Sequence, residues 1–212
     1  MDFHFFKRKK TLEEIHNYWK NPNDGKNKIE NFANPNKEKT RSALLLDVIH
    51  QQNVSKQSKI LELGCNVGRN LNYLYGKGYC NLSGIEINTS ALKKMEEIYP
   101  DLFTSITIFN NSIEEQISYF SEGEFDIVFT MAVLEHIHSE SEWIFQEMSR
   151  ITNGYLITIE DEKGNSSRHF PRQYGKIFKK IGLKQILEQK CNLPDLPKGF
   201  KVRVFTKPRK VA

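Results

Sequence analysis

The chain has 212 residues, of which 38% are hydrophobic and 27% are charged, and its formal net charge is +5. This length allows one globular domain with a sizeable core and a small appendage. No apolar run approaches the ~20 residues needed to cross a bilayer, so the sequence argues against a membrane-spanning protein.

Residues 1–37 are predicted to form an N-terminal arm outside the core. A helix is expected to begin at Thr11, because Glu14 follows three residues later in a capping-box pattern. Turn-forming residues then gather at 21–27 and 34–36. The arm either closes over a ligand as a lid or docks on the domain, and the sequence leaves both interpretations open.

Residues 38–212 are predicted to form one α/β domain in which strand and helix patterns alternate. Such units imply right-handed crossovers and a mostly parallel sheet with helices on both faces, and ligands bind beyond the carboxyl ends of its strands. The last two strands follow each other without a helix, which predicts an antiparallel hairpin at one sheet edge. Strands are expected at 59–63, 82–87, 105–109, 125–131, 155–159, 183–188 and 201–205, and helices at 38–52, 69–76, 89–99, 112–120, 132–150 and 172–181.

A glycine-containing turn follows the first strand of this domain. Gly64 and Gly68 let the backbone approach a ligand, and the free amides at the start of the next helix face it. Glu86 ends the second strand, ~20 residues further on, where a carboxylate accepts hydrogen bonds from a ribose diol. This pairing predicts a nucleoside-containing cofactor, but by itself it does not separate a methyltransferase from a nicotinamide enzyme.

Two details of the turn favour a cofactor without a diphosphate. The spacing Gly64-x-x-x-Gly68 is not the Gly-x-Gly-x-x-Gly of dinucleotide sites, and Asn66 in its middle tolerates a positive φ. Glu62, two residues before the first glycine, would repel a pyrophosphate but suits the amino group of a methionine moiety. The expected ligand is therefore a nucleoside with a cationic tail.

Three segments resemble motifs of the class I S-adenosylmethionine methyltransferases. Residues 62–68 resemble the family's first motif, residues 111–114 stand at its adenine-contacting turn, and residues 125–136 resemble its fourth strand with a Leu-Glu-His ending. The resemblance covers about residues 40–206. It implies a Rossmann-like seven-stranded sheet with the last strand antiparallel, S-adenosylmethionine as cofactor and S-adenosylhomocysteine as product. With Glu114 as an alternative contact in the adenine turn, the expected cofactor-binding residues are Arg41, Glu62, Gly64, Cys65, Asn66, Gly68, Asn70, Glu86, Ile87, Ser112, Ile113, Thr130 and Met131.

The residues after the fourth and fifth strands are the candidates for catalysis. An Asn/Asp-Pro-Pro-aromatic segment, usual in enzymes that methylate amino groups, is absent from the end of the fourth strand, which favours O-methylation. His136 and His138 could each serve as a base, or be structural. Arg172 and Tyr174, near Arg168 and His169, could bind an anionic acceptor or be surface groups. An acceptor that is already an oxyanion needs no base.

No metal site is expected. The acidic run 160–162 could bind an ion, but a solvated loop is the simpler interpretation. The three cysteines form no metal-ligand spacing and no even framework, which predicts a reduced cytoplasm. The first ten residues lack the apolar segment of a signal peptide.

These features predict O-methylation of a small polar or anionic acceptor. The chain also resembles methyltransferases of bacterial capsule and other surface-polysaccharide loci, including those proposed to methylate phosphoramidate. A nucleic-acid methyltransferase is an alternative suggested by a pI of about 9.0 and by basic clusters at 7–10 and 207–210, although solvated tails explain these clusters more simply. A non-catalytic cofactor-binding partner subunit is a third possibility, and the oligomeric state is left open.

Overall fold

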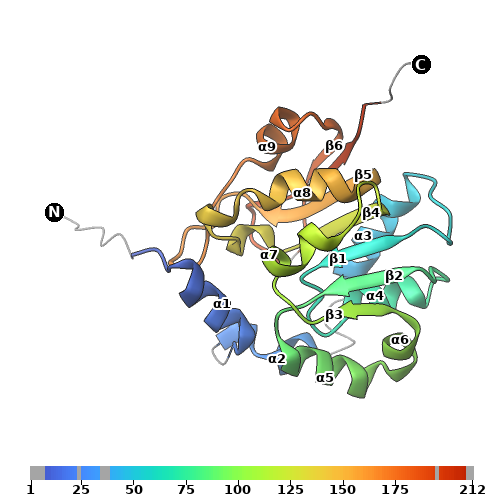
Figure 1. The fold of residues 1–212 in the computed structure, drawn as a ribbon, viewed down its shortest axis with the longest axis horizontal. Coiled ribbons are helices and arrows are strands. Elements are labelled where there is room, and N and C mark those ends of the chain that lie inside the picture. The colour runs from blue at the N-terminus through green and yellow to red at the C-terminus, as the bar shows by residue number, and fades with distance from the viewer. Residues whose placement is uncertain (1–7, 23–24, 34–38, 194–195, 209–212) are drawn as a thin grey trace.

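A computed structural model describes residues 8–22, 25–33, 39–193 and 196–208. Within these ranges a seven-stranded sheet lies between two layers of helices (Figure 1). The strand order is β3-β2-β1-β4-β5-β7-β6, and all neighbours are parallel except β7, which runs antiparallel to β5 and β6. The strands are β1 Ile60–Leu63, β2 Leu82–Ile85, β3 Thr107–Phe109, β4 Phe125–Met131, β5 Thr152–Asp161, β6 Lys184–Lys190 and β7 Phe200–Thr206.

The helices form two hydrophobic cores, one on each face of the sheet, because neighbouring strand residues point to opposite faces. Ile60 packs with the first set of helices, whereas Leu61 packs with the second. The first set is α3 Lys39–His50, α4 Arg69–Tyr75, α5 Thr89–Ile98 and α6 Pro100–Ser105, and the second is α7 Ile113–Gln116, α8 Ile144–Ile151 and α9 Tyr174–Lys180. Short 3-10 turns are η2 Ile117–Tyr119, η3 Leu134–His136 and η4 Ser139–Ser141.

The predicted sheet topology is confirmed, including the final hairpin with β6 at the edge. Some local predictions were wrong. The sequence predicted no helix over 100–105, but Pro100 starts α6 there, at a position where its missing N–H costs nothing. The helix expected over 112–120 is divided into α7 and η2, and the helical segments expected over 132–150 are η3, η4 and α8. Strand β5 extends to Asp161, because Asp161 pairs with Phe200 of β7.

The arm lies across the edge of the sheet where the parallel strands end. Its helix α1, Leu12–Lys20, has the predicted capping box between Thr11 and Glu14. Trp19 packs on His136, which follows β4, with the ring centroids 4.6 Å apart. The turn η1 Gly25–Asn27 and the helix α2 Ile29–Phe32 complete the described part of the arm. The division between arm and domain stays a prediction, because residues 34–38 lie outside the described ranges.

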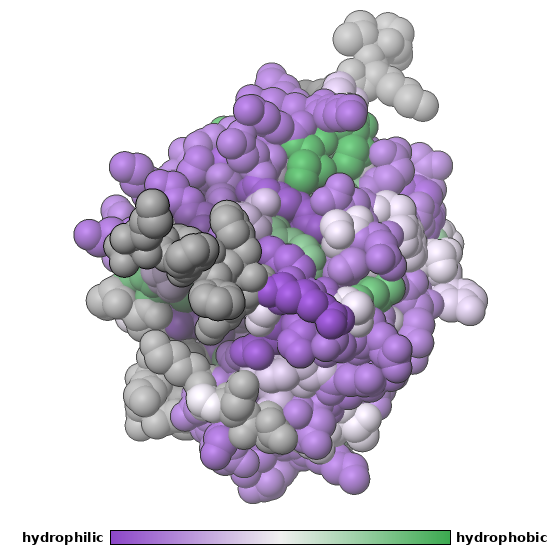
Figure 2. Space-filling model, turned by 90° about the vertical axis from the view of Figure 1, so that its left-hand side faces the viewer, coloured by the Kyte–Doolittle hydropathy of each residue, from purple (hydrophilic) through white to green (hydrophobic). Residues whose placement is uncertain are grey.

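Figure 2 shows the face on the α1 side of the molecule, which is mainly hydrophilic with several separate hydrophobic areas. Among the described helices, none combines the length and apolar character that crossing a lipid bilayer requires.

Candidate functional site

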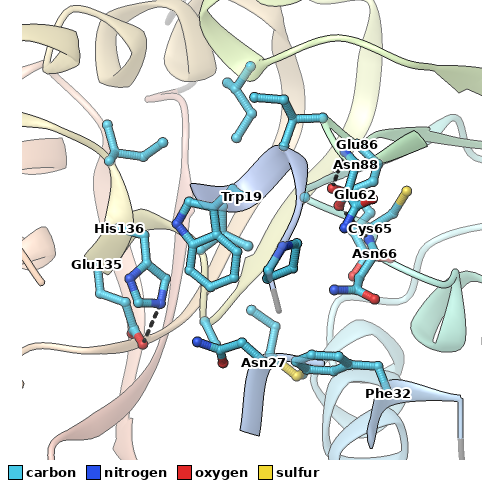
Figure 3. Close-up of a pocket in the computed structure, with 18 of the residues that line it drawn as sticks. Trp19, Asn27, Phe32, Glu62, Cys65, Asn66, Glu86, Asn88, Glu135 and His136 are labelled. Atoms are coloured by element: carbon cyan, nitrogen blue, oxygen red, sulfur yellow. Dashed lines mark hydrogen bonds and ion pairs between the residues drawn. The ribbon is translucent and has the colours of Figure 1, made fainter. Parts of the chain in front are cut away.

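A cavity of about 990 Å³ opens where the parallel strands end, and α1 and α2 border it. Glu62, Glu86 and Asn88 line one part of the cavity, and Glu135 and His136 line another, as Figure 3 shows. The side chain of Trp19 comes down from α1 between these two groups (Figure 3). We call the first part the nucleoside end and the second the acceptor end.

The loop between β1 and α4 approaches the cavity with its backbone. Gly64, Asn66 and Gly68 all have positive φ, at 73°, 50° and 73°. The predicted tolerance of Asn66 for this conformation is therefore confirmed. A side chain at Gly64 would also collide with Val133, because a Cβ there would lie 2.7 Å from Val133 Cγ2.

Glu86 joins this loop to the end of β2. Its Oε2 accepts a hydrogen bond from the backbone amide of Asn66 at 2.8 Å, and its Oε1 accepts one from the amide of Asn88 at 2.8 Å. Burial raises the pKa of the Glu86 carboxyl to about 7, although the backbone hydrogen bonds act in the opposite direction. Each oxygen keeps acceptor capacity for a ribose hydroxyl, since a carboxylate oxygen accepts more than one hydrogen bond.

Glu62 presents an unsatisfied oxygen at the nucleoside end. Its Oε1 accepts from Asn70 Nδ2 at 2.7 Å, whereas its Oε2 is buried with no hydrogen-bond partner among the described residues. Burial raises the pKa of this carboxyl well above its usual range. Asn70 is itself held by Ser42, whose hydroxyl donates to Asn70 Oδ1 at 2.8 Å. An ammonium group bound here would satisfy the buried oxygen, which fits the methionine part of S-adenosylmethionine.

Most of the predicted cofactor residues line the cavity, but two do not. Thr130 is fully buried in β4, and Gly68 faces the side chain of Met95. The predicted residues that line the cavity are Arg41, Glu62, Gly64, Cys65, Asn66, Asn70, Glu86, Ile87, Ser112, Ile113 and Met131.

Asn88 also lines the cavity, although it was not among the predicted cofactor-binding residues. Its Oδ1 caps α5 by accepting from the amides of Ser90 and Ala91, and its buried Nδ2 has no hydrogen-bond partner in the described part of the chain. Because capping uses only Oδ1, the Nδ2 donor of Asn88 is available to a ligand in the cavity. Arg69, Asn111 and Glu114 also line the cavity, the last as the alternative contact in the adenine turn.

Glu135, His136 and His169 meet at the acceptor end. Burial raises the pKa of Glu135 to about 7. Burial lowers the pKa of the His136 imidazole to about 3, although its hydrogen bond to the carbonyl oxygen of Arg168 acts in the opposite direction. Arg41 and Arg168 line the cavity with this group. The sequence singled out His136, while Glu135 was seen only as part of the Leu-Glu-His motif.

Three of the candidates for catalysis lie outside the cavity. His138 accepts from the amide of Glu140 through Nδ1 and packs edge-on against Phe170. Tyr174, the first residue of α9, is fully buried in the core and packs against Phe145 of α8. Arg172 holds backbone carbonyls together, with Nη1 donating to the oxygens of Leu134, Ile137 and Phe170 at 3.3, 2.8 and 3.1 Å. The structure thus brings His136 to the cavity without His138, Arg172 or Tyr174.

The expectation of a solvated acidic loop at 160–162 was wrong. Glu160 and Asp161 are only 1% and 5% exposed, because they are the last residues of β5. Glu160 Oε2 accepts from the amides of Val133 and Leu134, and Glu162 pairs with Arg203. These carboxylates hold the chain around the acceptor end in place.

Comparisons with known proteins agree with this geometry. Residues 61–158 match a family model described as a methyltransferase domain. No curated protein matches the chain. Among solved structures, a Galdieria sulphuraria protein proposed to be a sarcosine dimethylglycine methyltransferase has a TM-score of 0.65 at 16% identity, over 79% of this chain and 85% of its own.

Two further structures are similar at comparable identity. An S-adenosylmethionine-dependent methyltransferase from Aquifex aeolicus has a TM-score of 0.63 at 16% identity, over 87% of this chain and 98% of its own. The 1,6-didemethyltoxoflavin-N1-methyltransferase of Burkholderia thailandensis, solved with 1,6-didemethyltoxoflavin and S-adenosylhomocysteine, has a TM-score of 0.63 at 12% identity, over 83% of this chain and 80% of its own. At such identities the likeness establishes the fold.

The sheet topology is that of the class I methyltransferases. Together with the matched domain, it makes this protein an S-adenosylmethionine-dependent methyltransferase with S-adenosylmethionine as its cofactor.

Proposed function

We propose that the protein transfers a methyl group to an oxygen of a small anionic acceptor. The observation that carries this proposal is the pair Arg41 and Arg168, which come from separate segments and line the same cavity as Glu135 and His136. The charge of Arg41 acts on the pKa of Glu135 and the charge of Arg168 acts on the pKa of His136, so both arginines lie near the acceptor end. Guanidinium groups suit phosphate-like and carboxylate oxygens because their planar donors match the geometry of those anions. A phosphoramidate or a sugar intermediate of surface-polysaccharide synthesis has this character.

The size of the cavity supports a small acceptor. Its volume of about 990 Å³ must hold both the cofactor and the acceptor, and the arm borders it with Trp19 and Phe32. Sites that bury small molecules have volumes of roughly 300–1,000 Å³. A polymer would have to enter as one end or as one extruded unit.

In the proposed reaction, an acceptor oxygen forms the bond to the methyl carbon while the carbon–sulfur bond breaks and its electron pair stays on sulfur. The product is S-adenosylhomocysteine. An acceptor that enters as an oxyanion loses no proton, so the protein's part is to align the two reactants. Alignment alone contributes about 7–11 kcal/mol to lowering a barrier of this kind.

The test is transfer of a labelled methyl group from S-adenosylmethionine by the purified protein. The acceptors compared are phosphoramidate, phosphate monoesters, sugar phosphates, small carboxylates and a mixed RNA, with products identified by mass spectrometry. We expect methylation of at least one small anion. Methylation of RNA alone, with binding that weakens steeply as salt rises, would point to the nucleic-acid alternative. Tight binding of S-adenosylhomocysteine without transfer to any acceptor would instead support a non-catalytic subunit.

A further inference from the structure

Glu135, His136 and His169 bring one potential ligand atom each close together at the acceptor end of the cavity. These three atoms all lie within 4.8 Å of one another. Glu135 Oε1 lies 3.7 Å from His136 Nε2 and 3.8 Å from His169 Nε2, which is too long for hydrogen bonds. Ligand atoms that share one ion at about 2.0–2.2 Å are themselves roughly 3.0–3.5 Å apart. The two distances from Glu135 Oε1 exceed this range by only a few tenths of an ångström, and small side-chain movements that close the group would place all three atoms on one ion.

The other heteroatom of each side chain is already held by a hydrogen bond. His136 Nδ1 lies 3.1 Å from the carbonyl oxygen of Arg168, and His169 Nδ1 lies 2.6 Å from Ser166 Oγ. A carbonyl oxygen can only accept, so Nδ1 of His136 carries the proton and Nε2 of the neutral ring presents its lone pair. Glu135 Oε2 accepts from the amide of Asp161 at 2.6 Å. Such outer contacts are what fixes the orientation of metal-binding side chains.

Packing also fixes the two imidazole rings. The ring of His136 lies between those of Trp19 and His169, each with its centroid 4.6 Å away. In Figure 3, Trp19 stands beside His136 and the dashed line marks the 3.7 Å contact between His136 Nε2 and Glu135 Oε1. The amide of Phe170, the residue after His169, donates to the carbonyl oxygen of Glu135 at 2.7 Å, which ties the two segments together. The group is therefore built before any ligand arrives.

The proposed function places an anionic acceptor beside buried carboxylates, and a bound metal ion would remove this conflict of charge. The buried carboxylates of Glu135 and Asp161 line the same cavity as Arg41 and Arg168, and the charges of Asp161 and Arg41 both act on Glu135. Carboxylates alone repel an anionic acceptor. A divalent cation held by Glu135 would reverse the local charge and leave coordination positions for the acceptor's oxygen.

We propose that Glu135, His136 and His169 bind a divalent transition-metal ion, such as Mn²⁺, Co²⁺ or Zn²⁺, that holds the anionic acceptor beside the cofactor. Two imidazoles and one carboxylate with open positions suit this class of ion better than Mg²⁺ or Ca²⁺, which prefer ligand sets made of oxygen. The sequence predicted no metal, because these ligands come from two segments 33 residues apart and do not follow a recognised spacing. The role assigned to the ion rests on the proposed function, whereas its binding does not.

The test uses the full-length, untagged protein, treated with a chelator and then dialysed free of it. Titration with Co²⁺ alone is followed by visible absorption and calorimetry, and Mn²⁺ binding by electron paramagnetic resonance. We expect one ion per chain. His169→Gln and Glu135→Gln should each weaken binding at least tenfold, and Ser166→Ala, which removes only an outer contact, should weaken it about tenfold. His50→Gln, at an exposed site at the end of α3, is the matched control and should bind as the unaltered protein does.

Affinity for S-adenosylhomocysteine verifies that each variant is folded, because the cofactor contacts lie at the other end of the cavity. The metal proposal is overturned if Co²⁺ does not bind, or if it binds equally to His169→Gln and the unaltered protein. Methyl transfer to a small anion that persists in chelator would also overturn the role of the ion and leave the proposed function intact. Stoichiometric binding that depends on His169, without transfer to any small anion, would support the site and count against the proposed function.

Discussion

The carboxylate of Glu86 accepts a hydrogen bond from the backbone amide of Asn66, with Oε2 2.8 Å from the nitrogen. This contact ties the end of β2 to the left-handed residue of the loop after β1. The same carboxylate, which we expect to bind the cofactor, therefore also braces the loop after β1.

Replacing Glu86 by glutamine should weaken cofactor binding more than it weakens the fold. The amide retains one acceptor oxygen and the shape of the side chain, but it loses the charge-assisted hydrogen bonds. Hydrogen bonds to charged groups contribute about 1.5–3 kcal/mol, so the Kd of S-adenosylhomocysteine should rise roughly 10- to 100-fold. Calorimetry measures this change, and Glu96→Gln at an exposed position of α5 is the control. Equal affinities of the two variants would contradict the assigned contact.

Asn66 should be replaceable by glycine but not by valine. The left-handed conformation costs a β-branched residue about 1–2 kcal/mol, which corresponds to a loss of roughly 2–8 °C in Tm for a chain of this size. Asn53 has a similar φ of 51° and lies far from the cofactor loop in sequence, so it provides a matched comparison. Both Asn66→Val and Asn53→Val should lower Tm, measured by thermal unfolding, and only Asn66→Val should also weaken S-adenosylhomocysteine binding. A loss of affinity in both variants would show that destabilisation alone explains the effect.

The fold and the nucleoside end were predictable because they depend on local patterns. Alternating strand and helix signals determined the sheet topology, and Glu62, Asn66 and Glu86 stand at strand ends or turns that can be recognised along the chain. For example, the tolerance of asparagine for positive φ was enough to predict the backbone conformation of Asn66 from the sequence alone.

The acceptor end depends on long-range pairing that no local pattern reveals. Asp161 is buried because β5 pairs with β7 through Phe200, so an acidic run that appears solvated in the sequence closes the back of the site. Arg172 was predicted to face an acceptor, but the chain brings it against the carbonyls of Leu134 and Ile137. Polar residues after a strand identify a region, and only the packing separates those that face the cavity from those that hold it together.

Gly64→Ala should disturb the cofactor loop by steric contact as well as by backbone strain. The added Cβ would lie 2.7 Å from Val133 Cγ2, and the residue has a φ of 73°. Overpacking of this kind costs about 1–3 kcal/mol. The double variant Gly64→Ala/Val133→Ala should recover part of that loss, because it removes the colliding methyl groups. Chemical denaturation gives the free energy of unfolding of the unaltered protein, the two single variants and the double variant. If the effects of the two single substitutions simply add in the double variant, the two side chains do not interact.

Arg203→Met should strongly destabilise the C-terminal hairpin. Arg203 makes a bidentate pair with Glu162, at 2.8 Å from Nε and 3.0 Å from Nη2, and it is only 5% exposed. Removing one partner of a buried pair costs about 3–5 kcal/mol when the other charge is left uncompensated. Lys201 Nζ stays 3.2 Å from Glu162 Oε2 and compensates part of that charge, so a loss toward the lower end of this range is expected. The free energy of unfolding should therefore fall sharply in urea titrations. It should recover in part when Glu162→Gln is added, whereas Lys190→Met at an exposed site of β6 should have little effect.

The contact between arm and domain should strengthen as the pH falls. His16 Nε2 of α1 lies 3.2 Å from Glu114 Oε1, and this contact raises the pKa of His16 above its usual 6.5. A raised pKa means that the stabilisation is fully present below about pH 6.5 and is lost as the pH rises through the raised value. The charge of Glu115 also raises the pKa of His16, whereas the charge of Lys20 lowers it.

If the arm covers the bound cofactor, this contact sets how fast the cofactor leaves. Release of S-adenosylhomocysteine, followed by stopped flow, should be roughly two- to fivefold faster in His16→Gln than in the unaltered protein at pH 6, as expected for one partly exposed ion pair. The two proteins should converge at higher pH, where the unaltered histidine is neutral. The ratio of the two release rates reports on His16 alone, because the titration of Glu86 affects both proteins alike. A ratio that stays constant between pH 6 and pH 9 would mean that His16 does not close the arm.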